Sequence, residues 1–118
     1  MNHLQMTGRF KVAKENIEAF KKIVQACIKS TEEKDLHTLQ YDWFCNENQT
    51  EWTVREIFKD SDAAITHMEN LDELMDEILA VSDYFPEIYG NPSEEFLNAI
   101  SGFVPKVYSF FGQAKELQ

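Results

Sequence analysis

The chain has 118 residues, of which 43% are hydrophobic and 13% aromatic, and its formal net charge is −10. This length favours a single domain over residues 1–118 with one compact core. An acidic chain repels nucleic-acid phosphates and anionic membrane surfaces, so we expect neither nucleic acid nor a membrane among its partners. The sequence shows no signal-peptide pattern and no apolar run near the roughly 20 residues of a membrane span, which favours a cytoplasmic protein.

The first half of the chain alternates between strand and helix patterns. Residues 4–12 alternate apolar and polar side chains, which predicts a strand, and residues 15–32 carry a helical apolar stripe. The charged run 32–35 ends this helix, and we interpret it as a solvated connection. Residues 38–46 predict a second strand, which a polar turn at 47–50 joins to a third strand from Glu51. Two such strands form an antiparallel hairpin.

The stretch from Trp52 to His67 combines a strand with the helix that follows it. Its first residues alternate, so that Trp52, Val54, Glu56 and Phe58 share one face of the strand and Thr53, Arg55 and Ile57 share the other. Asp60 is a predicted helix N-cap, and residues 63–71 form the predicted helix. This unit places one histidine, His67, over the sheet.

The second half of the chain predicts a further helix over 71–79 and a short strand over 85–89. Because Pro86 cannot donate a backbone hydrogen bond, we place that strand at a sheet edge. Asn91 or Ser93 can cap a last helix, which contains Phe96 and Ile100. Residues 107–111 are a predicted final strand, and a polar tail follows.

This order of elements predicts an α+β fold of the ferredoxin-like class, a split β-α-β arrangement. We expect an antiparallel sheet with the helices on one face. Apolar residues occur on both faces of the predicted strands, so the face without helices needs a cover. A two-fold homodimer, sheet against sheet, provides one.

A set of spaced residues connects the second strand to the His67 helix: Tyr41-Asp42-Trp43, then Glu56-x-Phe58-x-Asp60-x-x-Ala63-x-x-x-His67. This pattern resembles the antibiotic biosynthesis monooxygenase superfamily of dimeric α+β barrels. The resemblance covers about residues 4–90 and leaves 91–118 as a C-terminal helix and strand extension.

The resemblance implies a homodimer with a small-ligand cavity between the sheet and the helices of each subunit. It also implies oxygenation of a planar, hydroxylated, quinol-like aromatic without a cofactor. The haem-degrading members use an asparagine on the first strand. Residues 4–12 contain none, so we do not expect haem degradation.

His67 and Glu56 are the candidate catalytic residues. A neutral imidazole at His67 can take a proton from a phenolic hydroxyl, and the alternative is a partly buried structural histidine. Glu56 lies among apolar neighbours, where a carboxylate is costly unless it is paired. It can orient His67 or form a hydrogen bond between subunits.

The candidate substrate-binding residues are aromatic or cationic strand residues: Tyr41, Trp43, Trp52, Arg55 and Tyr108. The aromatic side chains can stack on a planar ligand or serve as core and interface. Arg55 can hold an anionic oxygen or form a salt bridge across a dimer. The two cysteines, Cys27 and Cys45, are predicted to be buried free thiols, and no metal-ligand spacing occurs, so we expect no metal site.

Three functional hypotheses follow from these residues. The first is a small oxygenase with His67 as base or orienting donor and with Tyr41 and Trp43 as walls of the pocket. The second is a non-catalytic module that binds a hydrophobic metabolite or only dimerises, because a fold does not determine a function. The third is isomerase or decarboxylase chemistry, which also begins with the removal of a proton.

Overall fold

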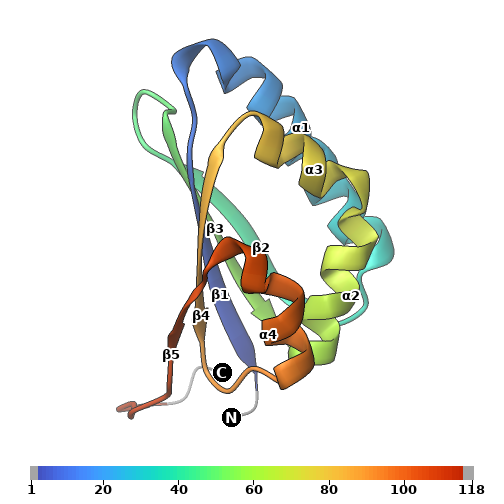
Figure 1. The fold of residues 1–118 in the computed structure, drawn as a ribbon, viewed down its shortest axis with the longest axis vertical. Helices are drawn as coiled ribbons and strands as arrows, with labels where there is room; N and C mark the ends of the chain where they lie inside the picture. Colours follow the sequence, from blue (N-terminus) through green and yellow to red (C-terminus); the bar gives the residue numbers. More distant parts are fainter. Residues whose placement is uncertain (1–2, 116–118) are drawn as a thin grey trace.

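A computed structural model describes residues 3–115, which form one sheet with the helices on one of its faces (Figure 1). In chain order the elements are β1 (Leu4–Lys11), η1 (Lys14–Asn16), α1 (Ile17–Lys34), β2 (Thr38–Cys45), β3 (Glu51–Phe58), α2 (Ser61–Leu71), α3 (Glu73–Ala80), β4 (Asp83–Tyr89), α4 (Glu94–Ile100), η2 (Ser101–Phe103) and β5 (Lys106–Tyr108). None of the helices in this part of the chain combines the length and the apolar character that crossing a membrane requires.

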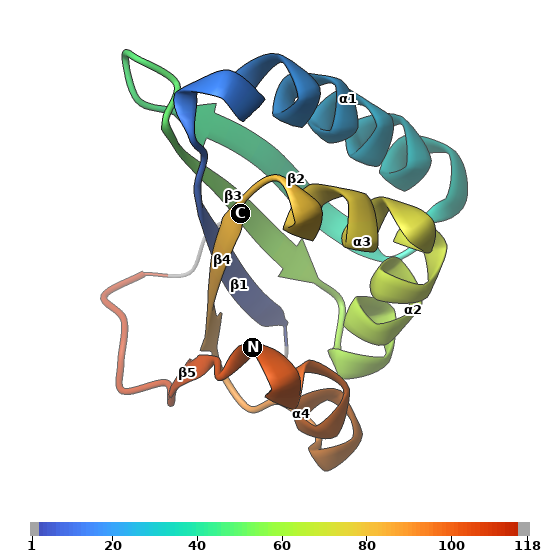
Figure 2. The ribbon, with the colours of Figure 1, turned by 45° about the horizontal axis from the view of Figure 1, so that its top comes forward.

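The strand order across the sheet is β2-β3-β1-β4-β5. All neighbouring strands are antiparallel except β4 and β5, which are parallel, so the sheet is mixed. Figure 2 shows α1, α2 and α3 packed over the same face of the sheet. The predicted α+β, ferredoxin-like class is confirmed, with β5 as a parallel addition at one edge.

Alternation along the strands decides which residues form the core. In β1 the residues Leu4, Met6 and Phe10 are buried, and their neighbours in sequence are more exposed. The α1 stripe buries Phe20 and Val24 against this face. The helices therefore cover the face that the alternating pattern predicted to be apolar.

The predicted helix starts are also observed. The Asp60 carboxylate accepts a hydrogen bond from the Ala63 backbone N–H at 2.9 Å, so Asp60 is the N-cap of α2. Of the two candidate caps of the last helix, Ser93 is the one used, because its hydroxyl accepts from the Phe96 N–H at 3.1 Å.

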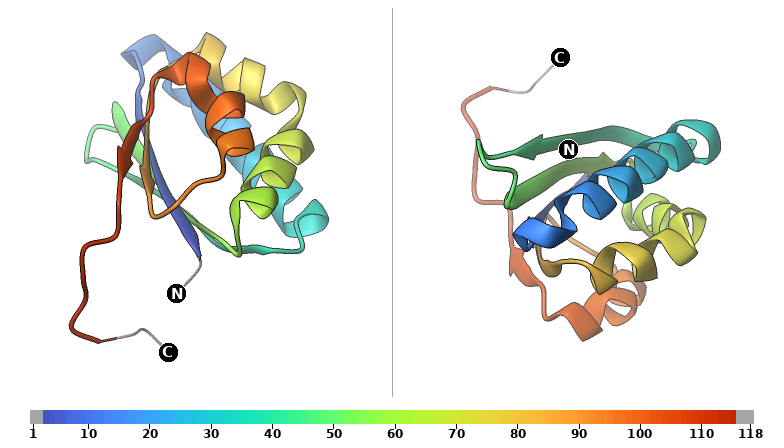
Figure 3. Two further views of the ribbon diagram at one scale, coloured as in Figure 1. Left: turned by 60° about the horizontal axis from the view of Figure 1, so that its bottom comes forward. Right: turned by 90° about the horizontal axis from the view of Figure 1, so that it is seen from above.

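The strand with Pro86 is not the edge strand that we predicted. β4 lies between β1 and β5, and Pro86 is buried opposite Gly8. β5 pairs with β4 only from Glu87 to Tyr89. On the β5 side of Pro86 no strand of residues 3–115 is therefore present that would need a backbone N–H from this residue. The predicted final strand, 107–111, is shorter and starts earlier, at Lys106–Tyr108, and the segment after it extends away from the sheet (Figure 3).

Two other predictions are wrong in detail. The charged run 32–35 is not wholly a solvated connection, because α1 continues to Lys34 and the side chain of Asp35 is only 3% exposed. Cys27 is buried as predicted, but Cys45 is exposed, since it lies at the end of β2, the outermost strand on its side of the sheet.

Gly8, in the middle of β1, allows two core side chains to approach the backbone. A Cβ atom at this position would lie 3.0 Å from Tyr84 Cε1 and 3.0 Å from Val54 Cγ1. Tyr84 in turn stacks on Phe10, with ring centroids 4.8 Å apart. The missing side chain at Gly8 therefore fixes the position of Tyr84 under the helices.

We predict that Gly8→Ala destabilises the protein by about 1–3 kcal/mol, because the added methyl group overpacks the core between Tyr84 and Val54. Urea unfolding followed by circular dichroism measures the change. Gly102→Ala is the matched control, since a Cβ there meets nothing within 4 Å. Equal unfolding midpoints for Gly8→Ala and the wild type would contradict the assigned packing.

Candidate active site

His67 lies on the buried face of α2 and is 3% exposed. Its Nδ1–H donates to the Asp35 carboxylate at 2.6 Å. Its Nε2 lies 3.4 Å from Glu56 Oε1. The three side chains thus form a row with the imidazole in the middle, and below we call Asp35, His67 and Glu56 the polar row.

Asp35 is fixed by three donors. It follows the last residue of α1 in an extended conformation, which places its carboxylate between the start of β2 and the end of α2. Besides His67 it accepts from the Thr38 hydroxyl at 2.7 Å and from the Asn70 amide at 2.8 Å. Burial alone would raise the pKa of Asp35, but these hydrogen bonds outweigh it and hold the pKa below its usual 3.8.

Glu56 reaches the site from the middle of β3 and is 7% exposed. Burial alone would lower the pKa of His67, but the hydrogen bonds and negative charges of Asp35 and Glu56 raise this pKa to about 9. His67 is therefore an imidazolium at neutral pH, with a proton on each ring nitrogen. It acts as a donor at both ends of the row.

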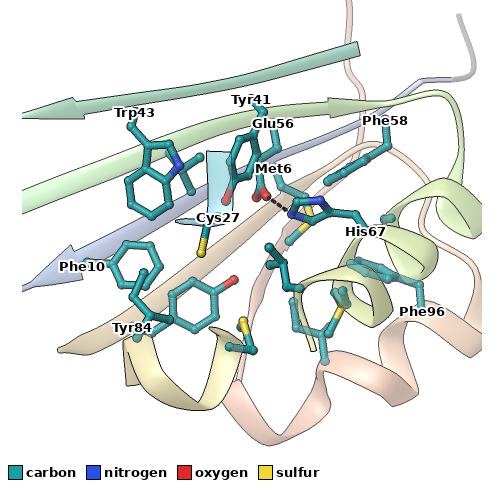
Figure 4. Close-up of a pocket in the computed structure, with 17 residues that line it drawn as sticks. Met6, Phe10, Cys27, Tyr41, Trp43, Glu56, Phe58, His67, Tyr84 and Phe96 are labelled. Atoms are coloured by element: carbon teal, nitrogen blue, oxygen red, sulfur yellow. Dashed lines mark ion pairs between the residues drawn. The ribbon is translucent and has the colours of Figure 1, made fainter. Parts of the chain in front are cut away.

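A cavity of about 40 Å³ lies beside Glu56 and His67, between the sheet and the helices (Figure 4). Its walls are mostly aromatic and aliphatic. The aromatic residues among them are Phe10, Tyr41, Trp43, Phe58, Tyr84 and Phe96. A largely apolar chamber with a few convergent polar groups is the usual form of a small-ligand site.

The other polar atoms of the cavity carry protons at neutral pH. Burial and the negative charge of Glu56 raise the pKa values of the Tyr41 and Tyr84 hydroxyls above their usual 10. Burial raises the pKa of the Cys27 thiol to about 11. The indole N–H of Trp43 is buried and has no hydrogen-bond partner within residues 3–115. Glu56 is thus the acceptor in a cavity whose other polar groups can donate.

The structure brings four of the sequence-predicted site residues together. His67, Glu56, Tyr41 and Trp43 all line the cavity. The Tyr41 ring packs edge-on against His67, with centroids 5.0 Å apart. The fold therefore brings these four side chains together, and their roles in binding and catalysis stay predictions.

The other three predicted substrate-binding residues do not line this cavity. Trp52 packs on Phe20 with centroids 5.2 Å apart, and its N–H donates to the Gln49 carbonyl at 2.7 Å. Arg55 is exposed on the opposite face of the sheet. Tyr108 is 46% exposed on β5. Alternation along β3 separates Arg55 from Glu56, and the position of β5 at the sheet edge separates Tyr108 from the cavity.

Sequence reasoning missed Asp35 and Tyr84. Asp35 is the last acidic residue of a charged run, and nothing in that run distinguishes a buried carboxylate from a solvated one. Tyr84 carries a usable signal, because it alternates with Pro86 and Ile88, both buried on the same face. A strand predicted to start two residues earlier, at Asp83, would have included it.

The described residues offer no metal centre. Within residues 3–115 no group of three histidine, cysteine or acidic side chains is arranged to hold a metal ion. The polar row is linear, with each carboxylate on a different ring nitrogen of His67, so its groups do not point at a common centre.

The chain was compared with known families and structures. The family model described as "Antibiotic biosynthesis monooxygenase" matches residues 5–76. No curated protein sequence matches the chain significantly.

Among solved structures, MupZ from Pseudomonas fluorescens is similar with a TM-score of 0.86 and 19% identity, over 98% of this chain and 96% of that one. A conserved protein from Methanosarcina mazei Go1 gives a TM-score of 0.69 at 20% identity, over 75% and 92% of the two chains. Rv0793 from Mycobacterium tuberculosis gives 0.68 at 14% identity, over 79% and 98%. At these identities the structures show a shared fold.

We predict that the stability of the protein falls as the pH rises from about 6.5 to about 9. The pKa of His67 is about 9 in the folded chain against 6.5 as a model value, so its pairing contributes fully below pH 6.5 and is lost above pH 9. Removing the charge with His67→Gln leaves two buried carboxylates without their cation, which costs about 3–5 kcal/mol.

Thermal unfolding of the wild type and His67→Gln between pH 6 and about pH 10 tests this prediction. The alkaline loss of stability should be smaller in His67→Gln. His37→Gln, at an exposed position outside the site, should follow the wild-type profile. Parallel profiles for the wild type and His67→Gln would contradict the raised pKa.

Proposed function

The chain belongs to the antibiotic biosynthesis monooxygenase family, and from this premise we propose that it oxygenates a planar, hydroxylated aromatic without a metal or flavin. The observation that carries the proposal is the polar row, which ends on Glu56 at an aromatic-walled cavity. The quinol or naphthol ring would lie in the cavity, against the walls that Tyr41 and Trp43 provide. Its hydroxyl would meet the charged end of the row.

In this reaction the protein contributes proton transfer, orientation and the exclusion of water. Loss of a hydroxyl proton raises the electron density of the ring, which then reacts with dioxygen. One oxygen atom enters the ring, and the other leaves as water with the two hydrogens that a quinol loses on becoming a quinone. The raised pKa of His67 supports the role of orienting donor for this residue over that of neutral base.

The size of the cavity requires movement on binding. The cavity volume is about 40 Å³, which is only slightly more than the volume that one molecule occupies in liquid water, about 30 Å³. An aromatic ring needs a larger volume than this. Met68 and Met75 line the cavity on either side of Asp72, where the chain turns with a φ of 51° between α2 and α3. Methionine side chains are unbranched and adapt their shape readily, so these two can move to admit a ring.

The small volume also favours a second candidate function, a non-catalytic module that binds a small hydrophobic metabolite. In that case the polar row is a buried structural element, and Met68 and the aromatic walls fill the space permanently. The two candidates differ in whether dioxygen is consumed when a ligand binds.

Oxygen consumption with a panel of quinols and naphthols tests the proposed activity. We predict turnover by the wild type for one class of aromatic and a loss of about 100-fold or more in His67→Gln, because the Glu56 carboxylate loses the donor that positions it. His37→Gln serves as the control. Turnover unchanged in His67→Gln would refute the assigned role. Thermal stabilisation by a ligand without oxygen uptake would favour the binding module.

We also propose that the protein is a homodimer, sheet against sheet. On the sheet face without helices, the Phe44 side chain is 52% exposed and the Phe85 side chain is 40% exposed. Ile57 lies on the same face, on β3, which is the strand between β2 and β1. Burying these side chains against a second copy would remove them from water.

Sedimentation velocity at micromolar concentration tests this arrangement. We predict a dimer of the 13.8 kDa chain for the wild type and a monomer for Phe44→Glu, which places a charge in the interface. Leu36→Glu is the control, because Leu36 is 88% exposed in the loop between α1 and β2. A monomeric wild type would contradict the sheet-to-sheet dimer.

A further inference from the structure

We propose that the cavity selects uncharged ligands that carry a hydroxyl group, and that Glu56 rather than His67 accepts the hydroxyl proton. The selectivity for uncharged, hydroxylated ligands stands on the cavity alone. The role of Glu56 in turnover rests on the proposed oxygenation.

The first step is the charge of the site. The polar row contains two carboxyl groups and one imidazole, so its acidic groups outnumber its one basic group. No lysine or arginine of residues 3–115 lines the cavity. An anionic ligand would therefore enter an apolar chamber without a free cation to pair with, which is costly. An uncharged ligand avoids this cost.

The second step is that the two carboxylates of the row are not equivalent. Asp35 accepts from His67, Thr38 and Asn70 and does not line the cavity. Glu56 lines the cavity, and its one ion-pair contact within residues 3–115 is the 3.4 Å approach of His67 Nε2. Asp35 therefore already accepts three hydrogen bonds outside the cavity, whereas Glu56 can accept a further hydrogen bond inside it.

The third step concerns His67. Asp35 holds its Nδ1–H and Glu56 faces its Nε2, so both ring nitrogens are directed at carboxylates of the row. A base needs a free lone pair on the atom that takes the proton. Neither ring nitrogen is free for a ligand, so His67 positions the Glu56 carboxylate, and Glu56 provides the accepting oxygen.

The fourth step is a second polar anchor for the ligand. The Trp43 N–H is buried without a partner in the described part of the chain, and Trp43 lines the same cavity. Trp43 pairs with Val54, and Tyr41 pairs with Glu56 on the adjacent strands. Trp43 and Glu56 are thus diagonal neighbours, roughly 7–8 Å apart at the backbone. Both side chains therefore reach the cavity from adjacent strands, and one ligand can place a hydroxyl at Glu56 and an acceptor oxygen at Trp43.

The proton transfer is balanced within the site. The ligand O–H bond breaks, the proton joins a Glu56 oxygen, and the electron pair of the bond stays on the ligand oxygen. The His67 imidazolium then faces a neutral carboxylic acid on one side and the new oxyanion close by, so the net charge of the site is unchanged. The Tyr84 hydroxyl, which keeps its proton, can donate to the oxyanion.

Isothermal titration with three matched probes tests the selectivity: 2-naphthol, its methyl ether 2-methoxynaphthalene, and 2-naphthoate. We predict that the wild type binds naphthol about tenfold or more tightly than the ether, as expected for a hydrogen bond to a charged acceptor. It should bind naphthoate most weakly. Glu56→Gln removes the charge with little change in shape, and it should reduce the preference for naphthol and strengthen naphthoate binding.

Glu51→Gln is the matched control, because it neutralises an exposed carboxylate on the same strand. It should leave all three affinities as in the wild type. Equal wild-type affinity for naphthol and the ether, tight binding of naphthoate, or no binding of naphthol would overturn the proposal. A naphthol preference that survives in Glu56→Gln would overturn it as well.

Oxygen uptake separates this inference from the proposed function. If Glu56→Gln lowers the binding selectivity but neither the wild type nor any variant consumes oxygen, the proposed ligand selectivity stands and the proposed oxygenase function fails. If Glu56→Gln consumes oxygen at the wild-type rate, the oxygenase function stands and the role of Glu56 as proton acceptor is refuted. A loss of uptake in Glu56→Gln with normal uptake in Glu51→Gln supports both.

Discussion

The 2.6 Å hydrogen bond between His67 and Asp35 is the interaction on which the rest of the site depends. It joins the end of α1 to the buried face of α2, and it holds an imidazolium inside an otherwise apolar core. A buried cation is costly unless it is paired, and the pairing is completed by Glu56 from the sheet. The hydrogen bond to Asp35 thereby orients the His67 ring so that its other nitrogen faces Glu56.

The sheet supplies the rest of the geometry through simple alternation. Because side chains on a strand alternate between faces, Glu56 faces the helices while Arg55 faces away. The close approach at Gly8 allows Tyr84 to lie across the middle of the sheet, where its ring stacks on Phe10. Rigid strands therefore present Glu56 and Trp43 at a fixed separation, and the helices above them carry the adaptable methionines.

Sequence periodicity predicted the elements well where one face is apolar and the other polar, as in β1, β3 and α2. It also placed His67, Glu56, Tyr41 and Trp43 on the inward faces, because that placement follows from local spacing. It failed where the outcome depends on contacts distant in sequence. Asp35 lies 32 residues from His67, and only the fold brings the two together. The interior position of β4 depends likewise on the short β5, which pairs with it only beyond Pro86.

The walls of the cavity come from different parts of the chain. The polar row lies wholly within residues 5–76, the range that matches the family, whereas α4 lies beyond it. Phe96 and Ile100 of α4 are 0% and 1% exposed, and both line the cavity. The charged end of the site is therefore part of the family scaffold, and an apolar wall comes from the C-terminal extension. Changes in α4 can reshape the space for a ligand without disturbing the ion pairs that hold His67.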